Sequence, residues 1–164
     1  MSTRPGTSPN SVRAAIEALD AAGAPTFVMT AAFEGKRTGL IVRSVQRCSD
    51  EPQLLCVAAR KGHSIEPLIR DSHHFVLCKV GANERLLLRK FGAEPPALSE
   101  EGLLPGQEGD PFDSLRVTTM FSGAPVLARS PLVFDCEVVR HFDLESDHEL
   151  YIGLVHAARF TAED

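Results

Sequence analysis

The spacing of hydrophobic positions changes once along the chain, and that change separates a helix from a series of strands. Val12, Ile16 and Leu19 recur at helical spacing, and Gly23 follows where a left-handed helix stop is favoured. The pattern predicts a helix over residues 12–22. Beyond it, the apolar positions follow the period of β-strands.

Six segments rich in β-branched and aromatic residues predict strands. They are residues 26–33, 38–45, 54–59, 74–80, 132–142 and 149–160. In the fifth segment Asp135 and Glu137 alternate with apolar residues, so we expect a core face and a mostly wet face. Such alternation is typical of antiparallel sheets. Closure removes the edges of such a sheet, so a mainly β, closed or nearly closed barrel is expected.

Helices are the minority element in this pattern. One short helix is predicted to open at Ser64, with Pro67 in its first turn, where proline is tolerated. Another runs from Asn83 to about Phe91. Residues 92–113 contain eight Gly or Pro and six acidic residues with no Lys or Arg, which predicts a long, acidic, irregular loop.

Length and composition restrict the class of protein. A chain of 164 residues fits a single domain. No apolar stretch approaches the roughly 18 residues that span a bilayer, and no signal-peptide core is visible, so a cytoplasmic protein is expected. Cys56, Cys78 and Cys136 lie in strand-like segments without zinc spacing, which predicts buried reduced thiols and no metal site.

Charge is distributed unevenly along the chain. The formal net charge of -5 argues against a nucleic-acid-binding protein. Residues 36–90 nevertheless hold 11 Lys and Arg against 5 Asp and Glu, which predicts that an anionic group docks on the middle third. No GxGxxG motif follows a strand, so a Rossmann dinucleotide domain is excluded.

Two polar segments follow successive predicted strands and carry groups that a phosphate requires. Residues 43–49 are expected to form a loop with two arginines and two serines, and Arg60 and Lys61 precede the helix that opens at Ser64. On composition alone a solvated hairpin and an ordinary helix start remain as alternatives. If both segments act together, we expect them to bind one phosphate-bearing ligand.

The order of these segments resembles the flavin reductase-like, FMN-binding split-barrel family over about residues 24–160. The resemblance rests on PTFVMTAAFEGKRTGL, GLIVRSVQRCSDEPQLL, HHFVLCKV, GAPVLARSPLVFDCEVV and SDHELYIGLVHAARF. Matches within the family's loop are Gly39, Ser44, Ser49 and Pro52. Departures from the family pattern are Ile41 and Arg43, where Thr and Asn are frequent, and Ser146, where Gly precedes Asp147 and His148.

The resemblance implies an antiparallel split β-barrel of Greek-key type, with about six strands and a few short helices. It would occupy residues 24–164 after an N-terminal tail and helix over residues 1–23. It further implies a homodimer that holds FMN, or FAD, and takes hydride from NADH or NADPH. Reduced flavin would then supply a partner oxygenase. The alternatives are a flavoredoxin-like electron carrier and a non-catalytic flavin-binding barrel.

The resemblance also directs attention to particular residues. The expected flavin-binding residues are Arg43, Ser44, Val45, Gln46, Arg47, Cys48, Ser49, Arg60, Lys61, Ser64 and Phe91. Arg60, Lys61 and Ser64 would hold the phosphate, and the segment from Arg43 to Ser49 would meet the ring edge, with Arg47 near its developing negative charge. His148 is the catalytic candidate, oriented by Asp147; the alternative is that both residues simply end a turn.

Overall fold

A computed structural model describes residues 9–92 and 110–162. Its main sheet contains β1 (Phe27–Phe33), β2 (Lys36–Val42), β3 (Ser44–Ser49), β4 (Leu54–Arg60), β5 (His74–Lys79), β8 (Leu132–Asp143) and β9 (His148–Phe160). The short strands β6 (Val117–Thr118) and β7 (Val126–Leu127) form a second sheet. The mainly β antiparallel fold class is confirmed.

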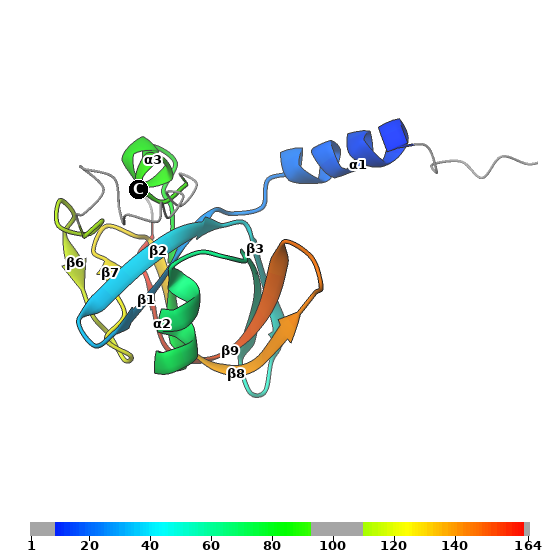
Figure 1. Cartoon of the computed structure of the whole chain (residues 1–164). Coiled ribbons are helices and arrows are strands. Elements are labelled where there is room, and N and C mark those ends of the chain that lie inside the picture. Colours follow the sequence, from blue (N-terminus) through cyan, green and yellow to red (C-terminus); the bar gives the residue numbers. More distant parts are fainter. Residues whose placement is uncertain (1–8, 93–109, 163–164) are drawn as a thin grey trace, which may run out of the picture.

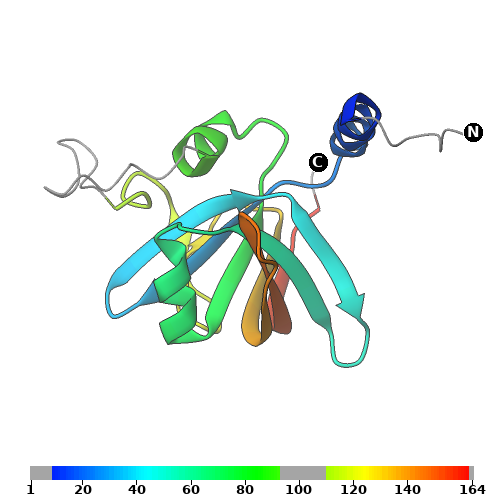
Figure 2. The ribbon, with the colours of Figure 1, turned by 45° about the vertical axis from the view of Figure 1, so that its right-hand side comes forward.

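The seven-stranded sheet has the order β2-β1-β5-β8-β9-β4-β3 and curves into a barrel, as Figures 1 and 2 show. Its two edge strands, β2 and β3, are consecutive in the chain and are joined by the single residue Arg43. The barrel is therefore split along one seam. We call the region around Arg43, where the two edges meet, the seam.

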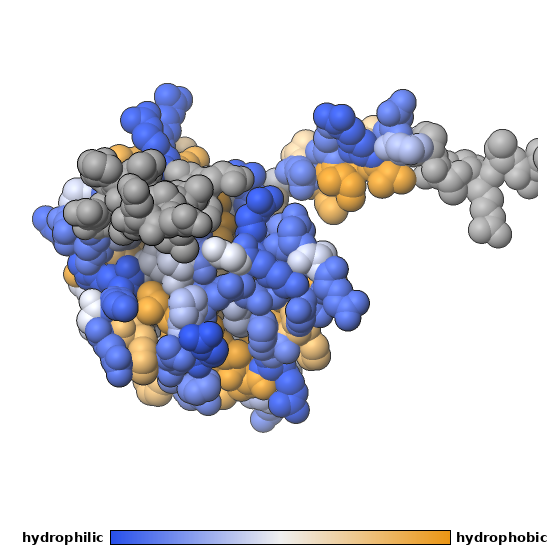
Figure 3. All heavy atoms as spheres, viewed as in Figure 1, coloured by the Kyte–Doolittle hydropathy of each residue, from blue (hydrophilic) through white to orange (hydrophobic). Residues whose placement is uncertain are grey.

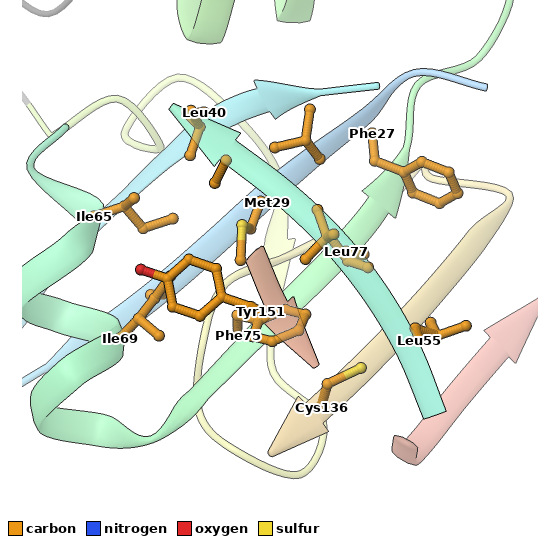
Figure 4. Packing of buried hydrophobic residues seen from close by; sticks show 14 of the residues in the cluster. Phe27, Met29, Leu40, Leu55, Ile65, Ile69, Phe75, Leu77, Cys136 and Tyr151 are labelled. Carbon is orange, nitrogen blue, oxygen red and sulfur yellow. The ribbon is translucent and has the colours of Figure 1, made fainter. Parts of the chain in front are cut away.

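Two hydrophobic clusters hold the sheet in this shape. The inner cluster fills the barrel and includes Met29, Phe75 and Tyr151. Helix α2 (Ile65–Ser72) closes it by inserting Ile65 and Ile69, which Figure 4 shows beside Tyr151. The outer cluster packs β1 and β5 against the short sheet and against helix α3 (Arg85–Gly92). Both clusters consist of apolar side chains removed from water, which is the main stabilising term.

The structure adds strands that the sequence pattern did not reveal. Residues 43–49 were expected to be a loop, and that prediction is wrong because residues 44–49 form β3. The preceding strand ends at Val42 rather than at residue 45. β3 is an edge strand whose side chains are exposed or half-buried, so it lacks the apolar alternation that identifies a strand.

The helices agree closely with the predictions, with one difference at a cap. Helix α1 (Pro9–Ala21) contains most of the predicted segment, and Gly23 has the expected left-handed φ of 87°. Ser64 precedes α2 but makes no side-chain cap hydrogen bond. Instead, the Ile65 backbone N–H donates to Nδ1 of His63 at 3.1 Å. Most of the predicted acidic loop, residues 93–109, lies outside the described residues.

The burial of side chains on β8 differs from the prediction, and on β9 it alternates between the two faces. Asp135 was assigned to a wet face, and that prediction is wrong because the residue is fully buried. On β9, Tyr151 and Gly153 are buried inside whereas Leu150 and Ile152 remain half-buried outside. Among the cysteines, Cys78 and Cys136 are buried as predicted, Cys56 is half-buried and Cys48 is exposed.

Asp135 is buried because it anchors the segment before the short strand β7. Its Oδ2 accepts the backbone N–H groups of Phe121 and Ser122, both at 2.8 Å. The same segment is held from the other side by Thr30, whose hydroxyl donates to the Pro125 carbonyl at 2.6 Å. A carboxylate can satisfy two adjacent backbone donors at once, so the polar side chain turns inward here.

Replacing Asp135 with Ala should lower the free energy of unfolding by about 3 kcal/mol, since two backbone donors lose their acceptor in a buried place. Urea unfolding measures the change. Asp50, whose side chain is 79% exposed, gives the matched control, and Asp50→Ala should change the stability by less than about 0.5 kcal/mol. Equal small losses in the two variants would contradict the anchoring role.

Candidate functional site

A cavity of about 370 Å³ opens at the seam of the barrel. Its walls come from the end of β2, the start of β3, the end of β4 with the residues that follow, the end of α3 and the start of β9. The lining residues are Leu40, Ile41, Val42, Arg43, Ser44, Ala58, Arg60, Lys61, His63, Phe91, Gly92 and His148. A cavity of this size is in the range that binds small ligands.

Six of the predicted site residues line this one cavity: Arg43, Ser44, Arg60, Lys61, Phe91 and His148. The two polar segments singled out in the sequence therefore meet in space. Val45 and Gln46 instead line a neighbouring groove. Arg47, Cys48 and Ser49 lie further along β3 and are not among the lining residues.

Arg47 and Ser64 are both outside the cavity wall. The Arg47 side chain is 70% exposed, and its Nε lies 3.4 Å from Oδ1 of Asp50. Ser64 is exposed, and its hydroxyl lies 3.5 Å from that of Thr38. In the described structure Arg43 is the arginine of the β2–β3 segment that lines the cavity.

Strand register brings Arg60 and His148 to the same wall. Arg60 is the last residue of β4 and pairs with His148, the first residue of β9. Their neighbours Ala59 and Glu149 also pair, and both are buried. Because successive side chains in a strand point to opposite faces, Arg60 and His148 project away from the core.

The β8–β9 turn holds the cations of the cavity. Oδ1 of Asp147 lies 2.9 Å from Nδ1 of His148, and Oδ2 lies 3.8 Å from Nη2 of Arg60. The Asp147 carbonyl also accepts the Lys61 backbone N–H at 2.9 Å. The Lys61 ammonium pairs with Asp143 at the start of the same turn. Three loop contacts thus orient two neighbouring cations.

These contacts keep both carboxylates ionised. The hydrogen bond with His148 lowers the pKa of Asp147, and the hydrogen bond from Lys61 lowers the pKa of Asp143. Each cation therefore has an anionic neighbour at neutral pH. Arg43, which precedes Ser44 where β3 pairs with Ala58 of β4, adds a third cation to the cavity.

The turn tolerates Ser146 in place of the glycine that the family pattern favours. The left-handed residue is Glu145, with φ 51°, rather than Ser146. The Ser146 hydroxyl accepts the backbone N–H of His148 at 3.2 Å. A local side-chain hydrogen bond of this kind stabilises a turn without glycine.

His63 is a lining residue to which the sequence gave little weight. Burial lowers its pKa, so the ring is neutral at neutral pH. Its Nδ1 accepts the Ile65 N–H, which puts the ring proton on Nε2. His63 is thus a hydrogen-bond donor beside Lys61. Its position directly before a helix was the signal in the sequence.

The pKa of His63 predicts how stability responds to acid. A neutral buried histidine contributes stability that is fully present above the ordinary pKa of 6.5 and is lost as the pH falls toward the lower folded-state pKa. Ring resonances followed by NMR should titrate with a midpoint below 6.5 for His63. His63→Gln should reduce the acid-side loss of stability, and an unchanged pH profile would contradict this origin.

The described residues contain no cluster of three or more His, Cys, Asp or Glu side chains that could hold a metal ion. Within the same residues, no helix has the length and apolarity needed to cross a bilayer. The side chains that line the cavity include three cations, the Ser44 hydroxyl, two histidines and the aromatic ring of Phe91.

The chain is similar in sequence and in fold to several known proteins. A family model described as flavin reductase like domain matches residues 19–164. The FMN reductase (NADH) RutF of Bradyrhizobium diazoefficiens is 24% identical over 148 residues, covering 90% of this chain and 76% of that protein.

Two solved structures share the fold. The NADH:FAD oxidoreductase SgcE6 of Streptomyces globisporus superimposes with a TM-score of 0.74 at 19% identity, covering 98% of this chain and 87% of that one. The nitrilotriacetate monooxygenase component B of Mycobacterium thermoresistibile gives a TM-score of 0.75 at 19% identity, covering 96% and 80%.

Proposed function

Because the chain belongs to the flavin reductase-like family, we propose that it is an NADH-dependent flavin oxidoreductase that binds FMN in the cavity at the seam. The observation that carries the proposal is the meeting of Arg43, Arg60 and Lys61 around one cavity. The choice of NADH and FMN follows the name of the RutF relative.

The residues of the cavity fit a flavin nucleotide. Two adjacent cations, Arg60 and Lys61, can donate charge-assisted hydrogen bonds to a phosphate. Arg offers a planar set of donors and Lys a compact charge, so together they suit a tetrahedral anion. The neutral His63 can add a third donor through Nε2. The ring of Phe91 supplies an aromatic wall.

Two further lining residues have the groups that an isoalloxazine edge requires. Arg43 brings fixed donors and a positive charge, and the Ser44 hydroxyl adds a donor or acceptor. FMN held by these residues would supply two-electron redox chemistry, with NADH as the hydride donor. The charge of Arg43 would stabilise negative charge on the pyrimidine side of the ring.

His148 is proposed to orient the ligands rather than to change them covalently. Asp147 accepts from Nδ1 of His148, which leaves Nε2 as the ring atom that meets a ligand. The same carboxylate lies near Arg60, so the three side chains form one supported group. In this role His148 would hydrogen-bond flavin or nicotinamide.

The proposal also includes partners. Two copies would form a homodimer, supported by the half-buried outward side chains Leu150, Ile152 and Leu154 on β9. Reduced flavin would pass to a separate oxygenase, a role supported by the name of the monooxygenase component that shares this fold. We take flavin to be a substrate that is exchanged rather than a permanently bound group.

Spectra and NADH oxidation test the function directly. We expect purified protein to oxidise NADH only when flavin is added, with FMN preferred over FAD and riboflavin. Yellow protein with one FMN per chain that oxidises NADH slowly would overturn the reductase and favour an electron carrier. Absence of saturable flavin fluorescence quenching would overturn flavin binding itself.

A further inference from the structure

A cavity of about 200 Å³ lies beside helix α3, and we call it the second cavity. Its walls come from α3, from the end of β5 with the residues after it, from the segment before β6 and from the turn after β7. Among the described residues, none lines both this cavity and the cavity at the seam. The proposed flavin site therefore does not account for the second cavity.

One part of the second cavity is apolar. Leu86 and Leu87 line it from α3, and Leu115 and Leu127 line it from the side of the short sheet. Figure 3 shows hydrophobic atoms beside hydrophilic ones at the position of α3, where Leu86 is 50% exposed. An apolar cavity of about 150 Å³ is enough to bind benzene. The second cavity therefore has room for one six-membered ring and a small substituent.

The other part of the second cavity is positively charged. Lys79, Arg116 and Arg129 line it together with one carboxylate, that of Glu84, which gives a formal charge of +2. Nη2 of Arg129 lies 3.8 Å from Oε1 of Glu84, so these two charges partly offset each other. Within the described residues, no ion pair joins Lys79 or Arg116 to a carboxylate. The lining therefore favours an anionic ligand.

The wall formed by the turn after β7 is held in place by hydrogen bonds from other strands. The hydroxyl of Ser130, a buried residue, donates to the Lys79 carbonyl of β5 at 2.7 Å. Nη2 of Arg159, on β9, donates to the carbonyls of Leu127 and Ser130 at 3.1 and 3.0 Å. A wall fixed in this way loses little conformational freedom when a ligand binds, so more of the interaction energy remains as affinity.

We propose that the second cavity binds a small organic carboxylate whose body is a single apolar ring, such as benzoate. The ring would lie against the leucines, and the carboxylate would accept hydrogen bonds from Arg116 and Lys79. Arginine can donate two parallel hydrogen bonds to a carboxylate, so Arg116 is expected to contribute most.

Other anions fit the second cavity less well. Inorganic phosphate would leave its apolar part empty. A nucleotide is too large, because ligands of that size occupy cavities of roughly 300 Å³ or more, whereas this one has about 200 Å³. A ring with one carboxylate matches the volume, the leucines and the cations together.

Methyl NMR with benzoate as the probe tests the site. In protein labelled at leucine methyl groups, benzoate should shift the resonances of Leu87, Leu115 and Leu127 in a saturable way. The expected dissociation constant is about 1 mM or tighter. Leu40 lines the cavity at the seam and is the internal reference, so its resonances should not move. Shifts that do not saturate, or that occur at Leu40 instead, would overturn the proposal.

The chemistry of the probe separates the contributions of ring and charge. Benzyl alcohol has the same ring without the charge and should bind at least about 10-fold more weakly than benzoate. Acetate has the charge without the ring and should also bind at least about 10-fold more weakly, because it buries less apolar surface. Equal binding of benzyl alcohol and benzoate would contradict the role of the cations. Equal binding of acetate and benzoate would contradict the role of the leucines.

Two substitutions test the contacts, each with a matched control. Arg116→Met should weaken benzoate binding by about 10-fold, whereas Arg89→Met, at an exposed position of α3 outside the cavity, should not change it. Ala128→Leu should fill the cavity and abolish binding, whereas Ala158→Leu, at an exposed position of β9, should leave it intact. Urea unfolding shows that each variant is folded. Unchanged binding by the Arg116→Met protein, or by a folded Ala128→Leu protein, would overturn the proposal.

The cations at the seam are the alternative binding place for benzoate, and the Arg60→Ala, Lys61→Met protein distinguishes the two. This protein lacks two cations of the proposed flavin site and should bind benzoate as the wild-type protein does. Saturating FMN should not displace benzoate either. Loss of benzoate binding in either experiment would locate the probe at the seam and contradict the second site. Neither result depends on the flavin reductase function, because the described linings of the two cavities differ.

Discussion

Replacing Arg60 with Ala and Lys61 with Met together should weaken FMN binding by at least about 100-fold, since a phosphate loses two charge-assisted hydrogen bonds. The loss has a second cause. Asp147 and Asp143, which now pair with these cations, would remain near the phosphate and repel it. Fluorescence quenching titrations with FMN measure the change.

The comparison with riboflavin makes this prediction specific. Riboflavin lacks the phosphate, so the double variant should bind it about as well as the wild-type protein does. Arg70→Ala is the matched control, because Arg70 is a 73% exposed arginine that pairs with Asp71 on α2 away from the cavity. Equal losses for FMN and riboflavin would show that the two cations support the fold rather than the phosphate.

Gly153→Ala should destabilise the protein by about 3 kcal/mol, because the barrel interior has no room for a methyl group at this position. A Cβ on Gly153 would lie 2.6 Å from Cζ of Phe75 and 2.8 Å from Cβ of Cys136. Both neighbours are fully buried, so neither can move without disturbing the inner cluster. Urea unfolding midpoints report the loss.

The same substitution at another glycine provides the control. Among the described residues, a Cβ on Gly92 would meet Cγ1 of Ile41 at an ordinary 3.7 Å, so Gly92→Ala should be neutral or slightly stabilising. Phe75→Leu should partly relieve the clash in the Gly153→Ala protein, which makes the two changes non-additive. If the effects of Gly153→Ala and Phe75→Leu on the free energy of unfolding are strictly additive, the destabilisation does not come from a clash with Phe75.

Sequence periodicity predicted the secondary structure correctly where a residue's neighbours along the chain determine its conformation. Glu34 and Gly35 connect β1 to β2 with the two left-handed angles, 49° and 79°, that a tight hairpin needs. The helices likewise begin and end within a few residues of the predicted positions. In these cases the local pattern and the tertiary structure favour the same conformation.

Sequence periodicity did not predict the features that depend on contacts between residues far apart in the chain. β3 is polar and exposed, and it is a strand because β4 lies beside it and supplies hydrogen bonds. Asp135 is buried because the segment containing Phe121 crosses over it from elsewhere in the chain. The close approach at Gly153 depends on Phe75 from another strand. None of these neighbours can be recognised from the local sequence.

The candidate site was predictable in its chemistry but not in its extent. Arg43, Arg60 and Lys61 were recognised as cations at the ends of successive strands, and the antiparallel pairing of β3 with β4, which puts Ser44 opposite Ala58, brings them to one cavity. Arg47 belongs to the same sequence segment, yet β3 carries it out to solvent beside Asp50. The difference arises because a strand moves about 3.3 Å per residue, so a few positions are enough to leave a small cavity.

Because the cavity lies at the seam, a bound ligand would also affect the stability of the barrel there. β2 and β3 are continuous only through Arg43, and the cavity takes its walls from both sides of that residue. A ligand bound in the cavity would contact both sides of the seam. It would thereby hold the β1–β2 hairpin and the β4–β9 half of the barrel together. Amide hydrogen exchange in β3 should then slow on binding, although the strand itself lies at an edge of the sheet.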